Sequence, residues 1–268
     1  MDFDALVTRL RAAGCVFAED EAELLLAATA DAGELERLVR RRVDGEPLEY
    51  VLGWAEFAGL RVRVAPGVFV PRRRTELLYG LAESALREAR AAARGARRVH
   101  ALELCCGAAP VATALKVHVP EASVTALDID PDAVAAARAN LEPFGGTVLE
   151  SDLFAALPAG ARFDVVVANA PYVPSGELHN MPREAREFEH AVALDGGADG
   201  LELHRRIAAE AAALLVPGGL VLVETSRRQA AADLADFEAH GWRVELVEDD
   251  ELDATAVVAR RERAGARP

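Results

Sequence analysis

The chain has few of the residues that mark several large classes of protein. Its three cysteines, Cys15, Cys105 and Cys106, are too few and wrongly spaced for a disulfide framework or a zinc site. The six histidines are scattered along the sequence, so we expect no metal site. Aromatic residues make up only 5% of the chain, and acids outnumber bases to give a net charge of −14. Proteins that bind nucleic-acid backbone need a basic face, so we expect no direct nucleic-acid partner.

Long apolar runs are also absent. No stretch reaches the roughly 18 residues that a membrane-spanning helix needs, and the opening residues Met1-Asp2-Phe3-Asp4 are acidic, unlike those of a signal peptide. We therefore expect a cytoplasmic protein without a membrane partner, and we expect a monomer. The 51% hydrophobic and 28% charged residues are ordinary globular composition, and 268 residues suffice for a buried core.

The first 52 residues predict a small helical bundle. Apolar residues follow the spacing of one helix face in three stretches, at residues 3–10, 22–26 and 35–43. Three short helices cannot bury a large core alone, so we expect residues 1–52 to form an accessory domain that recognises the substrate. A purely structural role is the alternative.

A β-hairpin linker is expected at residues 53–73. Leu60–Val64 alternates apolar and charged residues, as a half-exposed strand does. Trp54–Phe57 and Val68–Val70 flank it and complete the expected hairpin unit, with turns at Gly59 and Pro66-Gly67. Arg72–Arg74 then form a run of positive charge, either a solvated turn or a loop that closes over a cofactor or contacts an acidic partner. Thr75 predicts the N-cap of a helix over Glu76–Arg94.

From residue 99 strands and helices alternate, which predicts a doubly wound parallel sheet within residues 74–268. The expected strands are Val99–Leu104, Ser123–Leu127, Thr147–Leu149, Phe163–Ala168 and Leu220–Glu224. The expected helices are Val111–Val119, Asp132–Leu141 with Asp130 as N-cap, Gly200–Leu215 and Gln229–His240. Two final strands, Trp242–Val247 and Thr255–Ala259, are joined by a short acidic turn and must pair as a hairpin. The predicted α/β fold is Rossmann-like, and its antiparallel C-terminal hairpin suits a methyltransferase better than a dinucleotide dehydrogenase.

Three consecutive strand ends carry residues suited to a nucleoside-bearing cofactor. After the first strand, Glu103–Ala109 contains Gly107, which allows backbone and a helix N-terminus to approach an anionic group. Asp128 ends the second strand, where an acid can bind both ribose hydroxyls. Asp152 and Phe154 follow the third strand and suit an adenine amino group and ring. Each acid alone is more often a cap or a solvated loop residue, but this ordered set predicts the cofactor.

NAD and S-adenosylmethionine are the two cofactors that fit this pattern. The G-x-G-x-x-G fingerprint of NAD enzymes is absent, and the strand ends offer no group for hydride transfer. The Cys105-Cys106 pair is best explained as small buried packing rather than as redox chemistry. We therefore predict S-adenosylmethionine.

The stretch Val165–Pro174 combines a buried strand with a polar end. Its β-branched run predicts a central parallel strand, and Pro171 lacks the N–H that would continue it. Asn169, Ala170 and Tyr172 thus come at the carboxyl end of the strand, where open α/β sheets bind their ligands. An ordinary strand exit with an asparagine turn is the alternative.

Several motifs together resemble one known family. They are Glu46-Pro47…Tyr50…Leu52-Gly53…Glu56-Phe57…Gly59-Leu60, Val70-Pro71-Arg72…Thr75-Glu76, Arg186…Glu189, Ala193-Leu194-Asp195-Gly196-Gly197…Asp199-Gly200-Leu201, Leu215…Pro217-Gly218-Gly219 and Ala256–Arg260. With the strand ends above, they resemble the protein-(glutamine-N5) methyltransferases of the HemK/PrmC family. That family methylates the glutamine of the Gly-Gly-Gln motif in peptide-chain release factors.

The resemblance implies a helical bundle joined by a hairpin to a class I methyltransferase domain. The catalytic residues it implies are Asn169, Ala170, Pro171 and Tyr172. The residues implied to bind S-adenosylmethionine, with S-adenosylhomocysteine as the product, are Glu103, Cys105, Gly107, Asp128, Ile129, Asp152, Leu153, Phe154 and Asn169. The implied substrate-loop residues are Pro71, Arg72, Thr75 and Glu76.

Three departures from the family pattern predict a divergent member. Ala170 replaces the first proline of Asn-Pro-Pro-Tyr, Cys105 and Ala109 stand where glycines are usual, and Glu224-Thr-Ser replaces Glu-Ile-Gly. Residue 170 still precedes a proline and is held extended, so its main-chain carbonyl is kept.

An amide nitrogen is a weak nucleophile, so alignment is what the reaction needs. The Asn169 side-chain oxygen and the Ala170 carbonyl can each accept one amide N–H and point the nitrogen at the methyl group. The predicted function is transfer of a methyl group to the amide nitrogen of a protein glutamine. The alternatives are a small-molecule amide or amine N-methyltransferase, an adenine-N6 nucleic-acid methyltransferase and a catalytically degenerate cofactor-binding protein.

Overall fold

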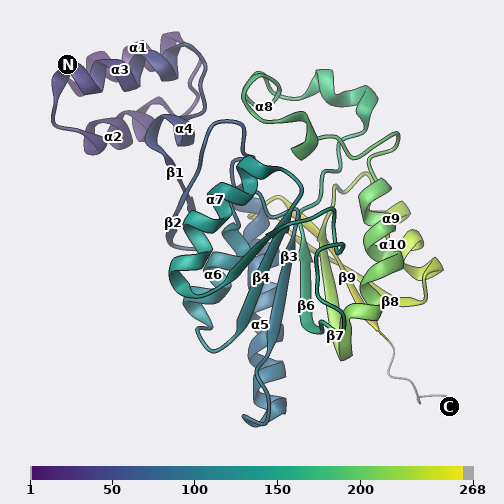
Figure 1. Ribbon diagram of the computed structural model, residues 1–268. Helices are drawn as coiled ribbons and strands as arrows, with labels where there is room; N and C mark the ends of the chain where they lie inside the picture. The colour runs from purple at the N-terminus through teal and green to yellow at the C-terminus, as the bar shows by residue number, and fades with distance from the viewer. Residues whose placement is uncertain (1, 262–268) are drawn as a thin grey trace.

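The computed structural model describes residues 2–261 and consists of an N-terminal helical bundle, a hairpin and a helix-flanked sheet (Figure 1). The α-helices are α1 (Phe3–Ala12), α2 (Ala18–Ala28), α3 (Ala32–Val43), α4 (Leu48–Leu52), α5 (Glu76–Ala93), α6 (Pro110–His118), α7 (Pro131–Leu141), α8 (Arg183–Phe188), α9 (Glu202–Glu210) and α10 (Ala230–Ala239). The strands are β1 (Trp54–Phe57), β2 (Leu60–Arg63), β3 (His100–Leu104), β4 (Ser123–Asp128), β5 (Thr147–Glu150), β6 (Phe163–Ala168), β7 (Leu215–Glu224), β8 (Trp242–Asp249) and β9 (Ala254–Arg261). Within residues 2–261, no helix is both long and apolar enough to span a membrane.

The large sheet has the order β5-β4-β3-β6-β7-β9-β8. Strands β5, β4, β3, β6 and β7 are parallel, whereas β9 runs antiparallel to both β7 and β8. The predicted α/β fold with a C-terminal antiparallel hairpin is therefore confirmed. Because β3 lies between β4 and β6, the strand order reverses there, and the carboxyl ends of β3 and β6 border the crevice where such sheets bind ligands.

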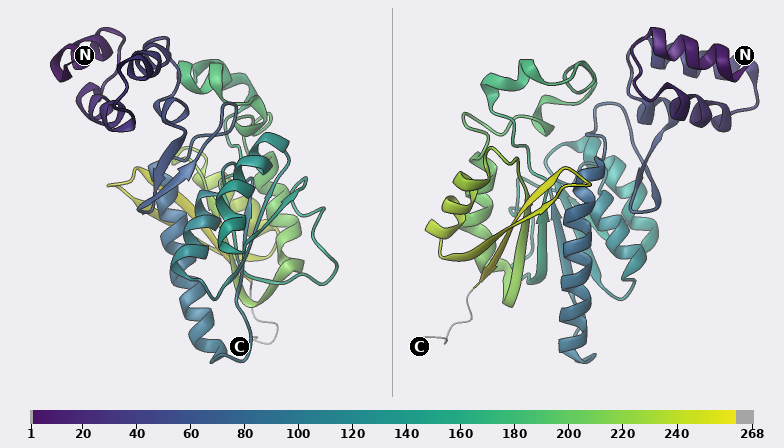
Figure 2. Two further views of the ribbon diagram at one scale, coloured as in Figure 1. Left: turned by 60° about the vertical axis from the view of Figure 1, so that its left-hand side comes forward. Right: turned by 180° about the vertical axis from the view of Figure 1, so that it is seen from behind.

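Strand β6 shows why this sheet needs helices on both faces. Val165 and Val167 pack into the core beneath α5, α6 and α7, whereas Val166 and Ala168 belong to the core beneath α9 and α10. Side chains alternate between the faces of a strand, so a strand covered on both sides is apolar throughout. Figure 2 shows α5 across one face and α9 with α10 on the other.

The N-terminal bundle has a core of its own, and it contacts the rest of the molecule through Tyr50 of α4, which packs into the core that also holds Phe57, and through charged groups. Asp2 and Asp31 cap α1 and α3, as their sequence positions favour. Arg42, in the last turn of α3, lies 2.6 Å from a carboxylate oxygen of Glu21 and 2.5 Å from one of Glu184 in α8. The bundle and α8 thus lie at the same end of the sheet (Figure 1).

Four local predictions are corrected by the structure. Residues 1–52 contain a fourth helix, α4, in addition to the three that the apolar spacing predicts, because its five residues are too few to show that spacing. Val68–Val70 is not a strand, so the hairpin consists of β1 and β2 alone. The helix expected over Gly200–Leu215 is α9 followed by a 3₁₀ turn, and β7 already begins at Leu215. Thr75 stands at the N-cap position of α5 as predicted, but its side chain makes no capping hydrogen bond, because its hydroxyl bonds to Glu224, whereas Asp130 caps α7 as predicted.

Candidate functional site

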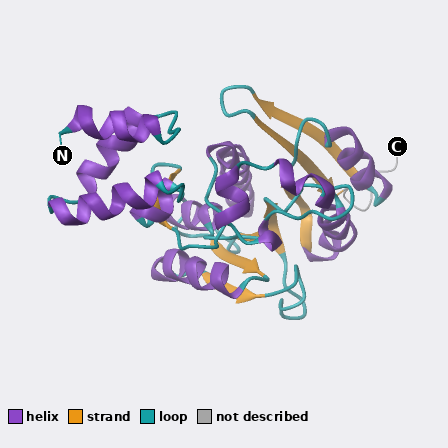
Figure 3. Ribbon diagram, turned by 90° about the horizontal axis from the view of Figure 1, so that it is seen from above, coloured by secondary structure: helices purple, strands orange, loops and turns teal. Residues whose placement is uncertain are grey.

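A cavity of about 1450 Å³ opens at the carboxyl end of the sheet. Its floor is formed by the loops after β3, β4, β5 and β6, and its walls include residues 68–75 and 181–198. Figure 3 looks down on this end of the sheet. A site for one small ligand typically has about 300–1,000 Å³. This cavity can therefore hold a nucleoside cofactor together with a group of an incoming substrate.

Asp128 joins the first two loops of the floor. Its Oδ2 accepts a hydrogen bond from the Gly107 amide at 2.8 Å, and its Oδ1 accepts one from the Asp130 amide at 2.9 Å. Burial raises the pKa of Asp128 above its ordinary value. Each oxygen retains a second lone pair for a ligand hydroxyl. At Gly107 an added Cβ would find its nearest neighbour, the Phe69 carbonyl oxygen, 3.8 Å away. The residues present thus fit a ribose and its attached chain.

The glycine-poor loop keeps a backbone that normally favours glycine. Cys105 and Ala109 have φ of +49° and +55°, in the left-handed region, and Leu153 on the neighbouring loop has φ of +45°. Each such residue costs about 1–2 kcal/mol, and this kind of strain persists mainly at ligand sites. Burial raises the pKa of the Cys105 thiol well above its ordinary value, which keeps it protonated. Cys105 and Ala109 thus adopt the left-handed backbone conformation that glycine normally takes.

Glu103 lies beneath the start of α6. It is 6% exposed, and its carboxylate accepts hydrogen bonds from the amides of Ala112 at 2.6 Å and Val111 at 3.4 Å. Burial raises the pKa of Glu103 to about 8. The residue lines the cavity and also ties β3 to α6, so it shapes the loop between them.

The loop after β5 differs from the sequence-based expectation. Phe154 is 7% exposed and packs into the core with the residues beneath α9 and α10, so its ring does not line the cavity. Leu153 lines it instead, and Ile129, which is 51% exposed, borders it from the loop after β4. Asp152 lines the cavity too, but it bonds to Arg206 at 2.9 Å.

Asn169, Ala170, Pro171 and Tyr172 all line the cavity where β6 ends. The Asn169 Nδ2 donates to Thr75 Oγ1 at 3.1 Å, and within residues 2–261 no donor reaches its Oδ1. The Tyr172 hydroxyl donates to Glu224 at 3.4 Å, and burial raises the pKa of Tyr172 to about 12, so the phenol is neutral. The stretch therefore presents a free amide oxygen beside an aromatic ring.

The backbone of this stretch is clamped from behind by residues 196–200 and by Gln229. The Gln229 side chain donates to the carbonyls of Tyr172 at 2.9 Å and Asp199 at 3.1 Å. A Cβ added to Gly196 would lie 2.6 Å from the Pro171 carbonyl oxygen, and one added to Gly200 would lie 2.3 Å from that of Tyr172. Only glycine allows this close backbone approach.

Gly196→Ala should therefore destabilise the protein and displace the stretch after β6. We expect the free energy of unfolding to fall by about 2 kcal/mol, as overpacking of a close contact typically costs. Chemical denaturation measures this. Gly176→Ala is the matched control, because a Cβ there meets nothing within 4 Å. Equal stability of the two variants would contradict the clamp.

The expected substrate-loop residues separate into two groups. Pro71, Arg72 and Thr75 line the cavity, whereas Glu76 accepts a hydrogen bond from the Ala58 amide and holds the hairpin turn instead. Glu189, from the segment after α8, pairs with Arg72 at 2.5 Å and also accepts from the Val70 amide at 3.2 Å. Residues 68–75 are thus fastened to the segment after α8.

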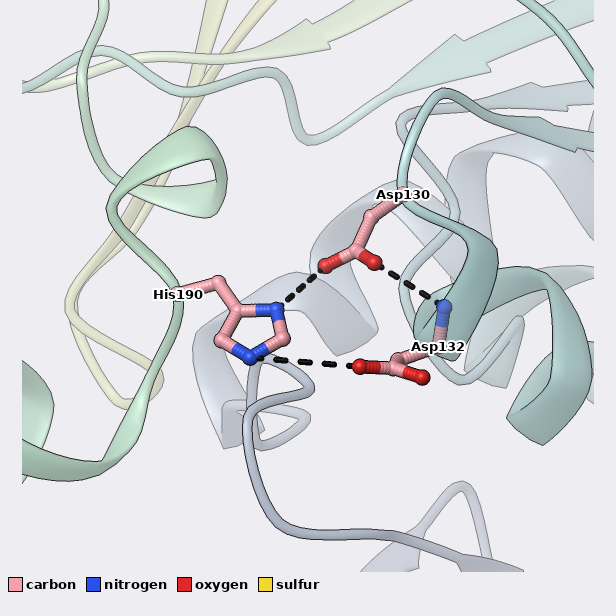
Figure 4. Close-up of side chains that lie close together, drawn as sticks. All are labelled: Asp130, Asp132 and His190. Atoms are coloured by element: carbon pink, nitrogen blue, oxygen red, sulfur yellow. Dashed lines mark hydrogen bonds and ion pairs between the residues drawn. The ribbon is translucent and has the colours of Figure 1, made fainter.

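His190 adds a second contact, between that segment and the loop that joins β4 to α7 (Figure 4). Its Nδ1 lies 2.7 Å from Asp130 Oδ2, and its Nε2 lies 4.0 Å from Asp132 Oδ2. The hydrogen bond to Asp130 raises the pKa of His190 above its ordinary value. The scattered histidines gave no sign of this cluster, because the fold brings together Asp130 and His190, which lie 60 positions apart in the sequence.

Sequence reasoning missed one part of this site. Glu224 ends β7, next to β6 in the sheet, and its buried carboxylate bonds to Thr75 and Tyr172. An acid at a strand end is the same signal that identified Asp128. Of the arginine run, Arg72 and Arg74 face Glu189 and Glu224, while Arg73 is exposed.

Comparison with known proteins gives consistent matches. Residues 80–189 match the family described as "Methyltransferase small domain". A release factor glutamine methyltransferase from Geobacter sulfurreducens is 40% identical, over 76% of this chain and 69% of that protein. A 4-amino-L-phenylalanine/4-methylamino-L-phenylalanine methyltransferase from Streptomyces pristinaespiralis is 37% identical, over 76% of this chain and 69% of that protein. The crystal structure of a methyltransferase from Pyrococcus furiosus shares the fold, with a TM-score of 0.53, 16% identity and coverage of 76% of this chain and 90% of that chain.

Proposed function

Because this chain belongs to the release factor glutamine methyltransferase family, we propose that it methylates the side-chain amide nitrogen of a glutamine in a protein, with a peptide-chain release factor as the substrate. The observation that carries the proposal is the Asn169 side chain. Its Nδ2 is held by Thr75 and its Oδ1 is left without a donor among residues 2–261, at the crevice beside the cofactor loops. An amide oxygen in that place is suited to accept an N–H of a substrate amide.

Residues on the cavity floor would hold the cofactor. Asp128 would accept the ribose hydroxyls, Gly107 and Cys105 would border the chain attached to the ribose, and Leu153 and Ile129 would pack against the adenine. When bound, S-adenosylmethionine supplies a methyl group on a sulfonium sulfur, which leaves as the neutral thioether S-adenosylhomocysteine. A leaving group of this kind requires no acid.

The chain's own residues supply alignment. Asn169 accepts one N–H of the substrate amide and the Ala170 carbonyl accepts the other, so that the nitrogen lone pair points along the line of attack. Tyr172 packs against the planar amide, and its neutral phenol avoids a charge beside it. The nitrogen gains the methyl group and releases one of its protons to water. Holding reactants in such an orientation contributes several kcal/mol without acid or base catalysis.

Residues 1–52 are the part we propose for substrate recognition, with residues 53–73 as a linker and residues 74–268 as the methyltransferase domain. The Arg42 contact to Glu184 supports this assignment, because Glu184 lines the cavity and the ion pair holds the bundle beside it. The net charge of −14 supports a protein rather than a nucleic-acid substrate. A monomer remains our expectation.

A second candidate function is methylation of an amine on a small molecule. It follows from the 4-amino-L-phenylalanine/4-methylamino-L-phenylalanine methyltransferase of Streptomyces pristinaespiralis, which is 37% identical to this chain, against 40% for the release factor methyltransferase. An amine on a small molecule needs the same alignment as an amide. The two functions differ only in the substrate, so an assay that offers both substrates to the same enzyme distinguishes them.

The test is methyl transfer from labelled S-adenosylmethionine to a purified, unmodified release factor, with mass spectrometry to locate the label. We expect one methyl group on the Gly-Gly-Gln glutamine and none on 4-amino-L-phenylalanine. Transfer to the amino acid but not to the release factor would replace the proposal by the second candidate. Cofactor binding without either transfer would overturn both.

A further inference from the structure

Glu224 lies at the centre of a buried network behind Asn169. Only 2% of the residue is exposed, and Thr75 Oγ1 donates to its Oε2 at 2.7 Å. On the other oxygen, the Tyr172 hydroxyl donates at 3.4 Å and Arg74 Nε lies 3.3 Å away as an ion pair. Thr75 in turn accepts from Asn169 Nδ2 at 3.1 Å. Two consecutive hydrogen bonds therefore connect the Glu224 carboxylate, through the Thr75 hydroxyl, to the Asn169 amide.

Which group donates in each of these two hydrogen bonds follows from the number of protons that the Thr75 hydroxyl carries. A threonine hydroxyl has one proton, and here it is donated to Glu224. Thr75 can then only accept from Asn169, so the amide must turn its NH₂ group inward and its oxygen outward. If the Thr75 hydroxyl donated to Asn169 instead, the Asn169 amide would rotate by half a turn. Its NH₂ group, a donor, would then face the cavity in place of its oxygen, an acceptor.

We propose that Glu224 and Thr75 are positioning residues that fix the amide of Asn169 with its oxygen toward the substrate nitrogen. The proposal rests on the function proposed above, in which that oxygen accepts an N–H of the substrate. Neither residue touches the substrate in this scheme. The carboxylate sets the direction of the hydrogen bonds, and the hydroxyl transmits it.

Glu224→Gln tests the direction directly, because it keeps the shape of the side chain. Arg74 can only donate, so the glutamine oxygen stays on the side of Arg74 and Tyr172 and its NH₂ group faces Thr75. The hydroxyl must then donate to Asn169, which reverses the amide. We expect kcat to fall about 100-fold, the typical effect of misdirecting one group that aligns the reaction. The affinity for S-adenosylmethionine should stay within threefold of the wild type.

Thr75→Val removes the hydroxyl that connects Glu224 to Asn169, so the Asn169 amide is free to take either orientation. We expect a smaller loss in kcat, about tenfold, because the substrate can still select the productive orientation. The double variant Glu224→Gln/Thr75→Val should then be about tenfold more active than Glu224→Gln alone. A structural role for Glu224 predicts the opposite, since a second lesion in a buried network would add to the first. Thr75→Ser, which keeps the hydroxyl, is the matched control and should retain activity.

A readout independent of turnover separates this proposal from the proposed function. In the wild type, NMR should show slow hydrogen exchange for the Asn169 side-chain NH₂ protons, because they bond to Thr75. In Glu224→Gln the same protons should exchange rapidly. If the wild type leaves release factor unmethylated, the proposed function fails, and the exchange rates still decide the orientation. Equal exchange in both proteins, or a double variant no more active than Glu224→Gln, would overturn the proposal.

Discussion

Replacing Asn169 with alanine is expected to lower the rate of methyl transfer about 1,000-fold, while S-adenosylmethionine binds with nearly its wild-type affinity. The substitution removes the oxygen that accepts the substrate N–H, and with it one of the two contacts that align the nitrogen. Loss of one preorganised polar group of this kind typically costs 100- to 1,000-fold, or about 3–4 kcal/mol. The cofactor contacts proposed for Asp128 and Gly107 lie on other loops and are unaffected.

The fold should tolerate this change. Asn169 is partly exposed, so its loss does not leave a buried cavity, and Thr75 keeps its hydrogen bond to Glu224. Single-turnover rates with labelled cofactor measure the methyl transfer, and calorimetric titration measures cofactor affinity. Asn180→Ala, at an exposed asparagine that does not itself line the cavity, is the control. Parallel loss of rate and of cofactor affinity would contradict the role assigned to Asn169.

The location of the site was predictable from the sequence because parallel sheets obey a simple rule. Asp128 and Asn169 each follow an apolar strand, and the carboxyl ends of such strands meet at one edge. This rule could not predict that Leu153, and not Phe154, lines the cavity. The left-handed backbone at Leu153 decides which of the two neighbours faces inward, and a leucine gives no sign of that conformation.

Contacts between distant segments were the other part that sequence patterns did not reveal. Thr75 has the position of a helix cap, but the fold places Glu224, 149 residues further on, within reach of its hydroxyl. A buried carboxylate is the stronger acceptor, so the side chain turns away from the helix. Likewise, Arg42 lies in the last turn of α3, within the N-terminal bundle, yet it pairs with Glu184, 142 residues away. Local propensity describes an element, whereas such partners depend on the whole topology.

Asp128→Ala is expected to weaken S-adenosylmethionine binding about 1,000-fold. Two losses combine in this variant. The ribose hydroxyls lose a charged acceptor, and hydrogen bonds to a charged group contribute about 1.5–3 kcal/mol each. The amides of Gly107 and Asp130 also lose the acceptor that joins the first two loops, so the floor of the cavity becomes less ordered before the ligand arrives. Two contacts of about 2 kcal/mol correspond to this factor.

Calorimetric titration with S-adenosylmethionine checks this prediction, and Asp132→Ala is the matched control. Asp132 lies four residues further along, exposed at the start of α7 and outside the cavity lining, so its removal changes the net charge equally without touching a loop amide. Near-equal affinities of the two variants would show that only overall charge matters. With saturating cofactor, Asp128→Ala should recover methyl transfer to within about tenfold of the wild type, because Asn169 still aligns the substrate. Asn169→Ala cannot be recovered in this way. Opposite responses to cofactor concentration therefore distinguish the group that holds the methyl donor from the group that directs the nucleophile.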